Sequence, residues 1–202
     1  MHLEVIVEEP SARTALQNIL PFLIGPAHSF RVLAFQDKGD MILNLPRRLR
    51  GYSHYHQKDF RIIVLLDEDR KDCRELKNQL EIETRNVGLI SKTAARGGAF
   101  QVVNRIAVEE LEAWFFGDIQ ALKAAFPRIP AALEYKAPYR VPDQIRGGTW
   151  EALHRVLRRA GYFPNFLPKI EVARRISLHM NPEFNRSHSF QVFRQGILAC
   201  LM

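Results

Sequence analysis

Apolar residues recur with two periods along the chain, and these periods predict where strands and helices lie. A continuous apolar run over residues 60–66 predicts a strand buried on both faces, as in a parallel sheet. Residues 12–23 carry apolar side chains at helical spacing after Ser11, a suitable N-cap. Over the first ninety residues the pattern predicts strands at 3–7, 29–36, 60–66 and 87–91 and helices at 12–23, 40–50 (disturbed by Pro46) and 70–85. Such alternation is typical of a mostly parallel α/β sheet flanked by helices.

The pattern changes after Ser91. A glycine-containing loop at 93–99 precedes a strand at 100–108 and two helices at 109–116 and 118–126. Proline and glycine then interrupt residues 127–148, which predicts a long irregular loop or lid. Three further helices are expected at 149–160, 168–180 and 187–202. We therefore expect one domain over 1–202, with an α/β core (1–126), the loop (127–148) and a C-terminal helical extension (149–202).

Composition narrows the function classes. The formal net charge is +7 and arginine outnumbers lysine, which suits a polyanionic partner such as nucleic acid; a GC-rich genome would give the same arginine bias. No apolar run approaches the roughly 20 residues of a membrane helix, and the N-terminus resembles no secretory signal, so we expect a cytoplasmic protein without membrane contact. The two cysteines, Cys73 and Cys200, are too few for a disulfide framework or a zinc knuckle.

Acidic residues follow the predicted strands. Glu8 comes after the first strand, Asp67 and Asp69 after the third, and Glu109 and Glu112 open a helix. Because parallel strands end at the same edge of a sheet, these carboxylates can converge and hold Mg²⁺ or Mn²⁺, which prefer oxygen ligands. Taken one at a time they also fit ordinary roles, since an acidic residue at the start of the helix at 70–85 is a favourable cap.

Two segments carry a resemblance to known families. The sequence Val-Glu-Glu-Pro-Ser-Ala at 7–12, together with Leu-Leu-Asp-Glu-Asp-Arg-Lys-Asp-Cys at 65–73, resembles the Toprim pattern of a glutamate after strand one and Asp-x-Asp after a later strand. The segment 104–115, Lys169 and the segment 185–190 resemble the DUF4276 family, which is grouped with Toprim-like proteins. The resemblance spans nearly the whole chain. One departure is Glu9, which stands where glycine is common in Toprim proteins.

The resemblance implies a site for phosphoryl chemistry that depends on Mg²⁺ or Mn²⁺. It implies that Glu8 is the general acid/base or a first metal ligand and that Asp67 and Asp69 are the main metal ligands. Glu112 and Glu109 would then supply a second metal position. By analogy with related nucleases, Lys169 would stabilise phosphate charge, although a surface lysine is the alternative.

Basic residues offer candidate contacts to nucleic acid. Arg96 precedes two glycines that let a backbone approach closely. The other candidates are Arg47 and Arg48 in one helix and Arg174 and Arg175 in another, where the alternative is a solvated helix face. His54 and His56 flank Tyr55 and would share a face if extended, but a polar loop is the alternative to a metal site there.

These features lead to three hypotheses. The first is a metal-dependent nuclease, the effector of a prokaryotic defence system against phage or mobile elements. The resemblance to the Toprim nucleases of overcoming-lysogeny-type systems implies a separately encoded ATPase as its partner. The chain itself has no Gly-x-x-x-x-Gly-Lys-Ser/Thr loop and is not expected to hydrolyse nucleotides by that route. The second is a non-catalytic Toprim-like subunit of an ATPase-containing complex. The third is hydrolysis or nucleotidyl transfer on small phosphate esters, which uses the same metal chemistry.

Overall fold

The computed structural model describes residues 1–54, 59–69 and 71–202. Its strands are β1 (His2–Val7), β2 (Ser29–Ala34), β3 (Phe60–Asp67) and β4 (Val102–Ala107). Its helices are α1 (Pro10–Ile24), α2 (Lys38–Ser53), α3 (Cys73–Asn86), α4 (Lys92–Ala95), α5 (Glu112–Gly117), α6 (Ile119–Ala125), α7 (Thr149–Arg159), α8 (Lys169–Ser177) and α9 (His188–Leu201). Three short 3₁₀ turns, η1 (Ala131–Tyr135), η2 (Ala137–Tyr139) and η3 (Pro142–Gln144), lie between α6 and α7.

The strands form one parallel sheet in the order β2-β1-β3-β4. The register pairs Val7 with Leu65 across β1 and β3, and Asp67 with Ala107 across β3 and β4. The predicted α/β class with a parallel sheet and flanking helices is therefore confirmed. Each strand follows from its apolar run, since β3 is buried at every position from Ile62 to Asp67.

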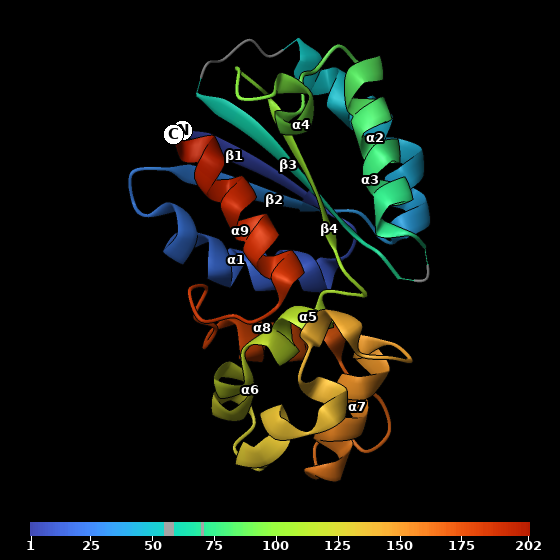
Figure 1. Ribbon diagram of the computed structural model, residues 1–202, viewed down its shortest axis with the longest axis vertical. Coiled ribbons are helices and arrows are strands. Elements are labelled where there is room, and N and C mark those ends of the chain that lie inside the picture. Colours follow the sequence, from blue (N-terminus) through green and yellow to red (C-terminus); the bar gives the residue numbers. More distant parts are fainter. Residues whose placement is uncertain (55–58, 70) are drawn as a thin grey trace.

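Helices cover both faces of this sheet (Figure 1). On one face, α2 and α3 pack against alternate strand residues such as Ile6 and Val64. On the other face, α1 and α9 pack against the residues between them, such as Val5 and Ile63. The result is a three-layer arrangement in which α9, the last helix, belongs to the same core as β1.

Helices α5 to α8 gather beside the carboxyl ends of the strands, below the sheet in Figure 1. Trp114 anchors them to α9: its ring lies 5.1 Å from that of Phe190, and its Nε1 donates to Ser189 Oγ at 2.9 Å. The segment 127–148 packs against α5 and the start of α9. Tyr139 stacks on Phe116, and the Asp143 carboxylate accepts hydrogen bonds at the N-terminus of α9, from the hydroxyl of Ser187 among others.

Two predicted elements are corrected. The strand predicted at 87–91 is wrong: Gly88 has φ +77°, and the amide of Leu89 donates to the Thr84 carbonyl, so these residues end α3 and leave a single bridge from Ser91 to Val102. The loop predicted at 93–99 holds the short helix α4, which Ser91 caps.

Several boundaries also differ from the prediction. The helix expected from 109 starts at Glu112, because Glu109 adopts a left-handed conformation with φ 62°. The helix expected at 40–50 extends over Lys38–Ser53 and accommodates Pro46. The helix expected from Arg70 begins at Cys73, and Arg70 itself lies outside the described residues. None of the described helices has the length and apolar character needed to cross a bilayer.

Candidate functional site

The parallel topology brings together the acidic residues that follow β1, β3 and β4. β1 and β4 lie on either side of β3, so Glu8, Asp67 and the α5 segment reach the same edge of the sheet. In open α/β sheets this carboxyl edge is where ligands bind. The structure therefore groups Glu8, Asp67 and Glu112 as the strand order requires.

Asp67 is at the centre of this group. It is the last residue of β3 and only 7% exposed. Burial raises the pKa of Asp67 well above its usual range, and the neighbouring carboxylates of Glu8 and Glu112 raise it further. A buried carboxyl group beside two others is costly to ionise. It therefore stays protonated unless a cation compensates its negative charge.

Glu8 and Glu112 flank Asp67 and share its environment. Burial, together with the carboxylate of Asp69, raises the pKa of Glu8 to about 7. Burial also raises the pKa of Glu112 to about 8, against the opposing effect of the Lys169 ammonium group. In the described part of the chain, the Oε2 atom of each glutamate is buried without a hydrogen-bond partner. Two acceptor atoms are thus available to a proton or a cation.

Asp69 lies at the rim of the group, where Lys38 holds it. The Lys38 ammonium group donates to the carbonyl of Asp67 at 2.5 Å, the carbonyl of Glu68 at 3.1 Å and Asp69 Oδ2 at 2.9 Å. Asp69 has φ 53°, a conformation that is strained for a residue other than glycine. It does not cap the following helix; Asp72 does, by accepting from the amides of Arg74 and Glu75. The capping alternative therefore applies to Asp72 and not to Asp69.

Lys38 is not among the site residues that the sequence predicts. A signal was available, because Lys38 begins α2 shortly after the carboxyl end of β2, the same edge of the sheet. What the sequence does not reveal is that its ammonium group crosses to the turn after β3.

Lys169 and Glu9 close the other side of the group. The Lys169 ammonium group lies 3.4 Å from Glu9 Oε2 and 4.8 Å from the centre of the Trp150 ring. Burial alone would lower the pKa of Lys169, but the carboxylates of Glu112 and Glu9 outweigh burial and raise it. Lys169 is therefore a charged neighbour of the acidic group. Glu9, which sequence analysis noted only as a departure from the Toprim pattern, pairs with it.

Glu109 differs from Glu112 in its exposure and surroundings. Its amide donates to Glu68 Oε2 at 2.9 Å, and its carbonyl accepts from the Asp69 amide at 2.8 Å. Burial and the Glu68 carboxylate raise the pKa of Glu109. Glu109 lines a cleft of about 650 Å³ together with Lys38 and Asp69. Asp67 and Glu112 are buried instead.

The chemistry of this group fits a hard cation, and its present side-chain positions do not enclose one. All candidate ligands offer carboxylate oxygens, as Mg²⁺ and Mn²⁺ prefer. Within residues 1–54, 59–69 and 71–202, however, no three His, Cys, Asp or Glu side chains are gathered closely enough to hold a metal ion. Binding would require side-chain rotation of at least one of Glu8, Asp67 and Glu112.

The five candidate arginines do not join the acidic group. Arg48 lines a separate cavity at the amino ends of the strands. It lies about 15 Å along α2 from Lys38, at about 1.5 Å per residue, and Arg47 precedes it. Arg96 ends α4 in a left-handed conformation, ahead of β4. In α8, Arg175 lies over the Phe126 ring and Arg174 is exposed. His54 follows α2, while its predicted partner His56 lies outside the described residues.

Comparison with known proteins places the chain in a family. The family model described as "Domain of unknown function (DUF4276)" matches residues 7–198, which include Glu8, Asp67, Glu112 and Lys169. No curated protein and no solved structure matches the chain. With nearly its whole length matched, this protein belongs to the DUF4276 family.

Proposed function

We propose that this protein is a divalent-metal-dependent phosphodiesterase that cleaves nucleic acid, DNA or RNA. The meeting of Glu8, Asp67 and Glu112 at neighbouring parallel strand ends carries the proposal, because two of their buried oxygens have no hydrogen-bond partner in the described part of the chain. The net charge of +7 suits a polyanionic substrate. A glutamate after β1 and Asp-x-Asp after β3 also support a Toprim-like relationship.

The residues of the acidic group and the two lysines beside it would have different roles. Mg²⁺ or Mn²⁺ held by Glu8, Asp67, Asp69 and Glu112 would stabilise phosphate charge and activate water. Glu8 can serve as a metal ligand or as the general acid/base, because its Oε2 atom is buried in the group and has no hydrogen-bond partner in the described part of the chain. Lys169 adds positive charge beside the group for a developing phosphate charge. Lys38 fixes the turn that carries Asp67 and Asp69.

The test is cleavage of plasmid DNA, single-stranded DNA and bulk tRNA with Mn²⁺, Mg²⁺ or a chelator. We expect metal-dependent cleavage by the wild type and a loss of about a hundredfold or more in Asp67→Asn, since changes to outer-shell groups alone cost up to about a hundredfold. Asp72→Asn is the matched control, because it changes the same residue type in the same turn and asparagine also caps helices. Full activity in Asp67→Asn would refute the assignment.

We further propose that the protein acts as the effector of a prokaryotic defence system with a separately encoded ATPase. The resemblance to Toprim nucleases that accompany overcoming-lysogeny-type ATPases is the ground for this proposal. Co-purification with an ATPase encoded nearby, and cleavage that appears only in its presence, would support this arrangement. Cleavage by the isolated chain at the same rate with and without that ATPase would contradict it.

A second candidate is a non-catalytic interaction subunit. The ion pairs Lys38–Asp69 and Lys169–Glu9 favour it, because they compensate two of the carboxylates without any metal. The melting temperature in Mn²⁺ separates the two functions. An enzyme that awaits its partner binds Mn²⁺ and is stabilised even when it cleaves nothing, whereas an interaction subunit with a vestigial site shows no shift.

A further inference from the structure

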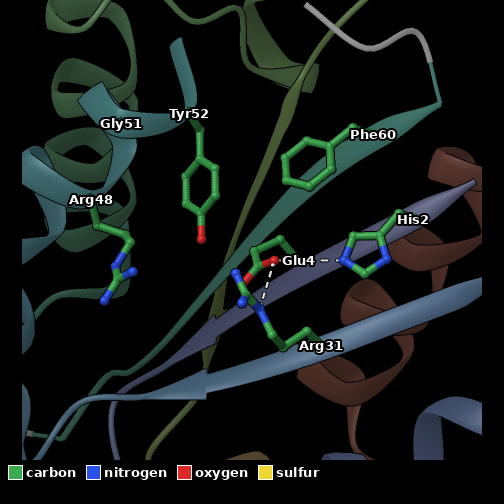
Figure 2. Close-up of a pocket in the computed structure, with 7 residues that line it drawn as sticks. All are labelled: His2, Glu4, Arg31, Arg48, Gly51, Tyr52 and Phe60. Carbon is green, nitrogen blue, oxygen red and sulfur yellow. Dashed lines mark hydrogen bonds and ion pairs between the residues drawn. The ribbon is translucent and has the colours of Figure 1, made fainter. Parts of the chain in front are cut away.

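A second polar cavity lies at the opposite edge of the sheet from the acidic group. It has a volume of about 570 Å³, within the range of small-molecule sites. Its walls come from the first residues of β1, β2 and β3 and from the end of α2; the residues used below are His2, Glu4, Arg31, Arg48, Tyr52 and Phe60 (Figure 2). Phe60 and Asp67 are separated by roughly 20 Å along β3 at about 3.3 Å per residue, so this cavity is distinct from the cleft beside Asp69.

A buried carboxylate fixes the base of this cavity. Glu4 is only 1% exposed, on the same face of β1 as the core residue Ile6. Arg31, its neighbour in the register of β2, donates through Nε to both Glu4 oxygens at 2.9 and 3.2 Å. The Arg31 side chain is nevertheless 59% exposed. Glu4 therefore holds a guanidinium group in a defined position at the cavity while much of that group stays accessible.

Aromatic rings form one wall of the cavity. His2 and Phe60 are stacked with centroids 5.6 Å apart and planes 16° apart, and the Tyr52 ring lies 5.6 Å from Phe60. The Tyr52 hydroxyl points towards Glu4 and Arg31 in Figure 2. It is buried beside the Glu4 carboxylate and the Arg31 guanidinium group, and burial together with the Glu4 carboxylate raises the pKa of Tyr52. The wall thus combines flat apolar faces with a hydroxyl group that borders Glu4 and Arg31.

Arg48 completes the cavity from α2. Its exposed guanidinium group lies opposite Arg31 in Figure 2, so two guanidinium groups face the same space. Guanidinium groups bind phosphate through paired hydrogen bonds, and nucleobases stack on aromatic side chains. The cavity brings both kinds of group together within one small-molecule volume.

We propose that this cavity binds a nucleotide, with the base against the ring wall of Tyr52 and Phe60 and the phosphate at Arg31 and Arg48. The ligand is either a free mononucleotide or one nucleotide of a strand, since both present the same base and phosphate. The proposal does not depend on the acidic group being catalytic.

Isothermal titration calorimetry of the full chain, in the presence of a metal chelator, tests the nucleotide-binding proposal. The ligands are AMP, GMP, CMP and UMP, a short 5′-phosphorylated single-stranded oligonucleotide, inorganic phosphate and the corresponding nucleosides. We expect saturable binding of at least one nucleotide ligand, tighter than phosphate or nucleoside alone. Binding of mononucleotides identifies a free nucleotide as the ligand, and binding of the oligonucleotide alone identifies a strand.

Variants assign the binding to this cavity. Arg48→Ala should weaken affinity by about tenfold or more, the size expected for a lost charge-assisted contact. Arg50→Ala is the matched control, since Arg50 is an exposed arginine of the same helix that does not line the cavity. Tyr52→Phe keeps the ring and removes only the hydroxyl, and it should weaken binding by a smaller factor. Circular dichroism confirms that each variant is folded, and Arg48→Gln replaces Arg48→Ala if that variant is not.

Three results would overturn the proposal: no saturable binding of any nucleotide ligand, equal losses in Arg48→Ala and Arg50→Ala, or phosphate binding as tightly as the nucleotides. The titrations contain chelator and no divalent metal, so their outcome does not depend on whether the acidic group is catalytic. A failure of the nucleotide-binding proposal and a failure of the proposed metal-dependent activity are therefore separate outcomes.

Discussion

Replacing Glu112 by glutamine tests whether a protonated carboxyl is buried at the strand ends. Glu112 is 2% exposed, and burial raises its pKa from 4.5 to about 8. Between these two values the folded chain holds a proton that the unfolded chain has released. The contribution of Glu112 to the free energy of unfolding is therefore greatest below pH 4.5 and is lost as the pH rises towards about 8. Glutamine does not titrate, so Glu112→Gln should lose this pH dependence.

The size of the effect follows from proton linkage. One group contributes about 1.4 kcal/mol per pH unit inside its window, so a rise of about two pH units, from about 5.5 to about 7.5, lowers the free energy of unfolding by up to about 3 kcal/mol. This is an upper bound because Glu8 and Asp67 compete for the same protons. For a chain of this size it corresponds to a fall in melting temperature of about 6 to 10 °C. Stability at a single pH also depends on what the new amide contacts, so the slope against pH is the quantity to compare.

The assay is thermal and urea unfolding in chelator across this pH range for the wild type, Glu112→Gln and Glu75→Gln. Glu75 is exposed in the first turn of α3, so its variant should keep the wild-type slope. Adding Mn²⁺ near pH 7.5 should restore stability to the wild type and not to Glu112→Gln, because the ion replaces the proton. A wild-type slope in Glu112→Gln would refute the burial of a protonated carboxyl at this position.

Three further predictions address the site and its support. Mn²⁺ should raise the melting temperature of the wild type but not of Asp67→Asn in differential scanning fluorimetry, and equal shifts would locate the metal elsewhere. Asp143→Ala should lower the free energy of unfolding in urea by about 2 to 4 kcal/mol, because Asp143 accepts the hydrogen bonds at the start of α9; Asp143→Asn should lose less. Trp114→Ala should cost about 3 to 5 kcal/mol by the same measurement, because the ring is fully buried, and a loss below 1 kcal/mol would contradict its role as an anchor.

Most of the sheet is predictable from the sequence because parallel strands need little more than an apolar run. Residues 60–66 and 3–7 carry such runs, and the sheet places β1 beside β3 as the convergence of Glu8 and Asp67 requires. Residues 87–91 have the same apolar character but end a helix, because the positive φ of Gly88 turns the chain. Local apolar content does not distinguish a strand from a helix terminus of this kind.

The candidate site was predictable only as far as strand ends position it. Glu112 joins Asp67 because α5 follows β4 at the same edge of the sheet, whereas Glu109, in a left-handed conformation before that helix, lines the cleft beside Asp69. Lys38 was missed because its contact to the turn after β3 spans about thirty positions of sequence. Such contacts depend on the packing of α2 over the sheet, which no local pattern encodes.

The charge balance of the group supports the proposal that a cation binds there. Among the described residues, the carboxylates of Glu8, Glu9, Asp67, Asp69, Glu110 and Glu112 interact with one another at this edge of the sheet, and the ammonium groups of Lys38 and Lys169 face them. The ion pairs lie at the rim, on Asp69 and Glu9, and the carboxylates between them are the ones whose pKa burial raises. Near neutral pH Glu112 therefore holds a proton and Glu8 is partly protonated, unless a cation replaces these protons. Binding of a divalent ion must release those protons, so its affinity should rise with pH up to about 8, opposite to the trend in the stability of the metal-free chain.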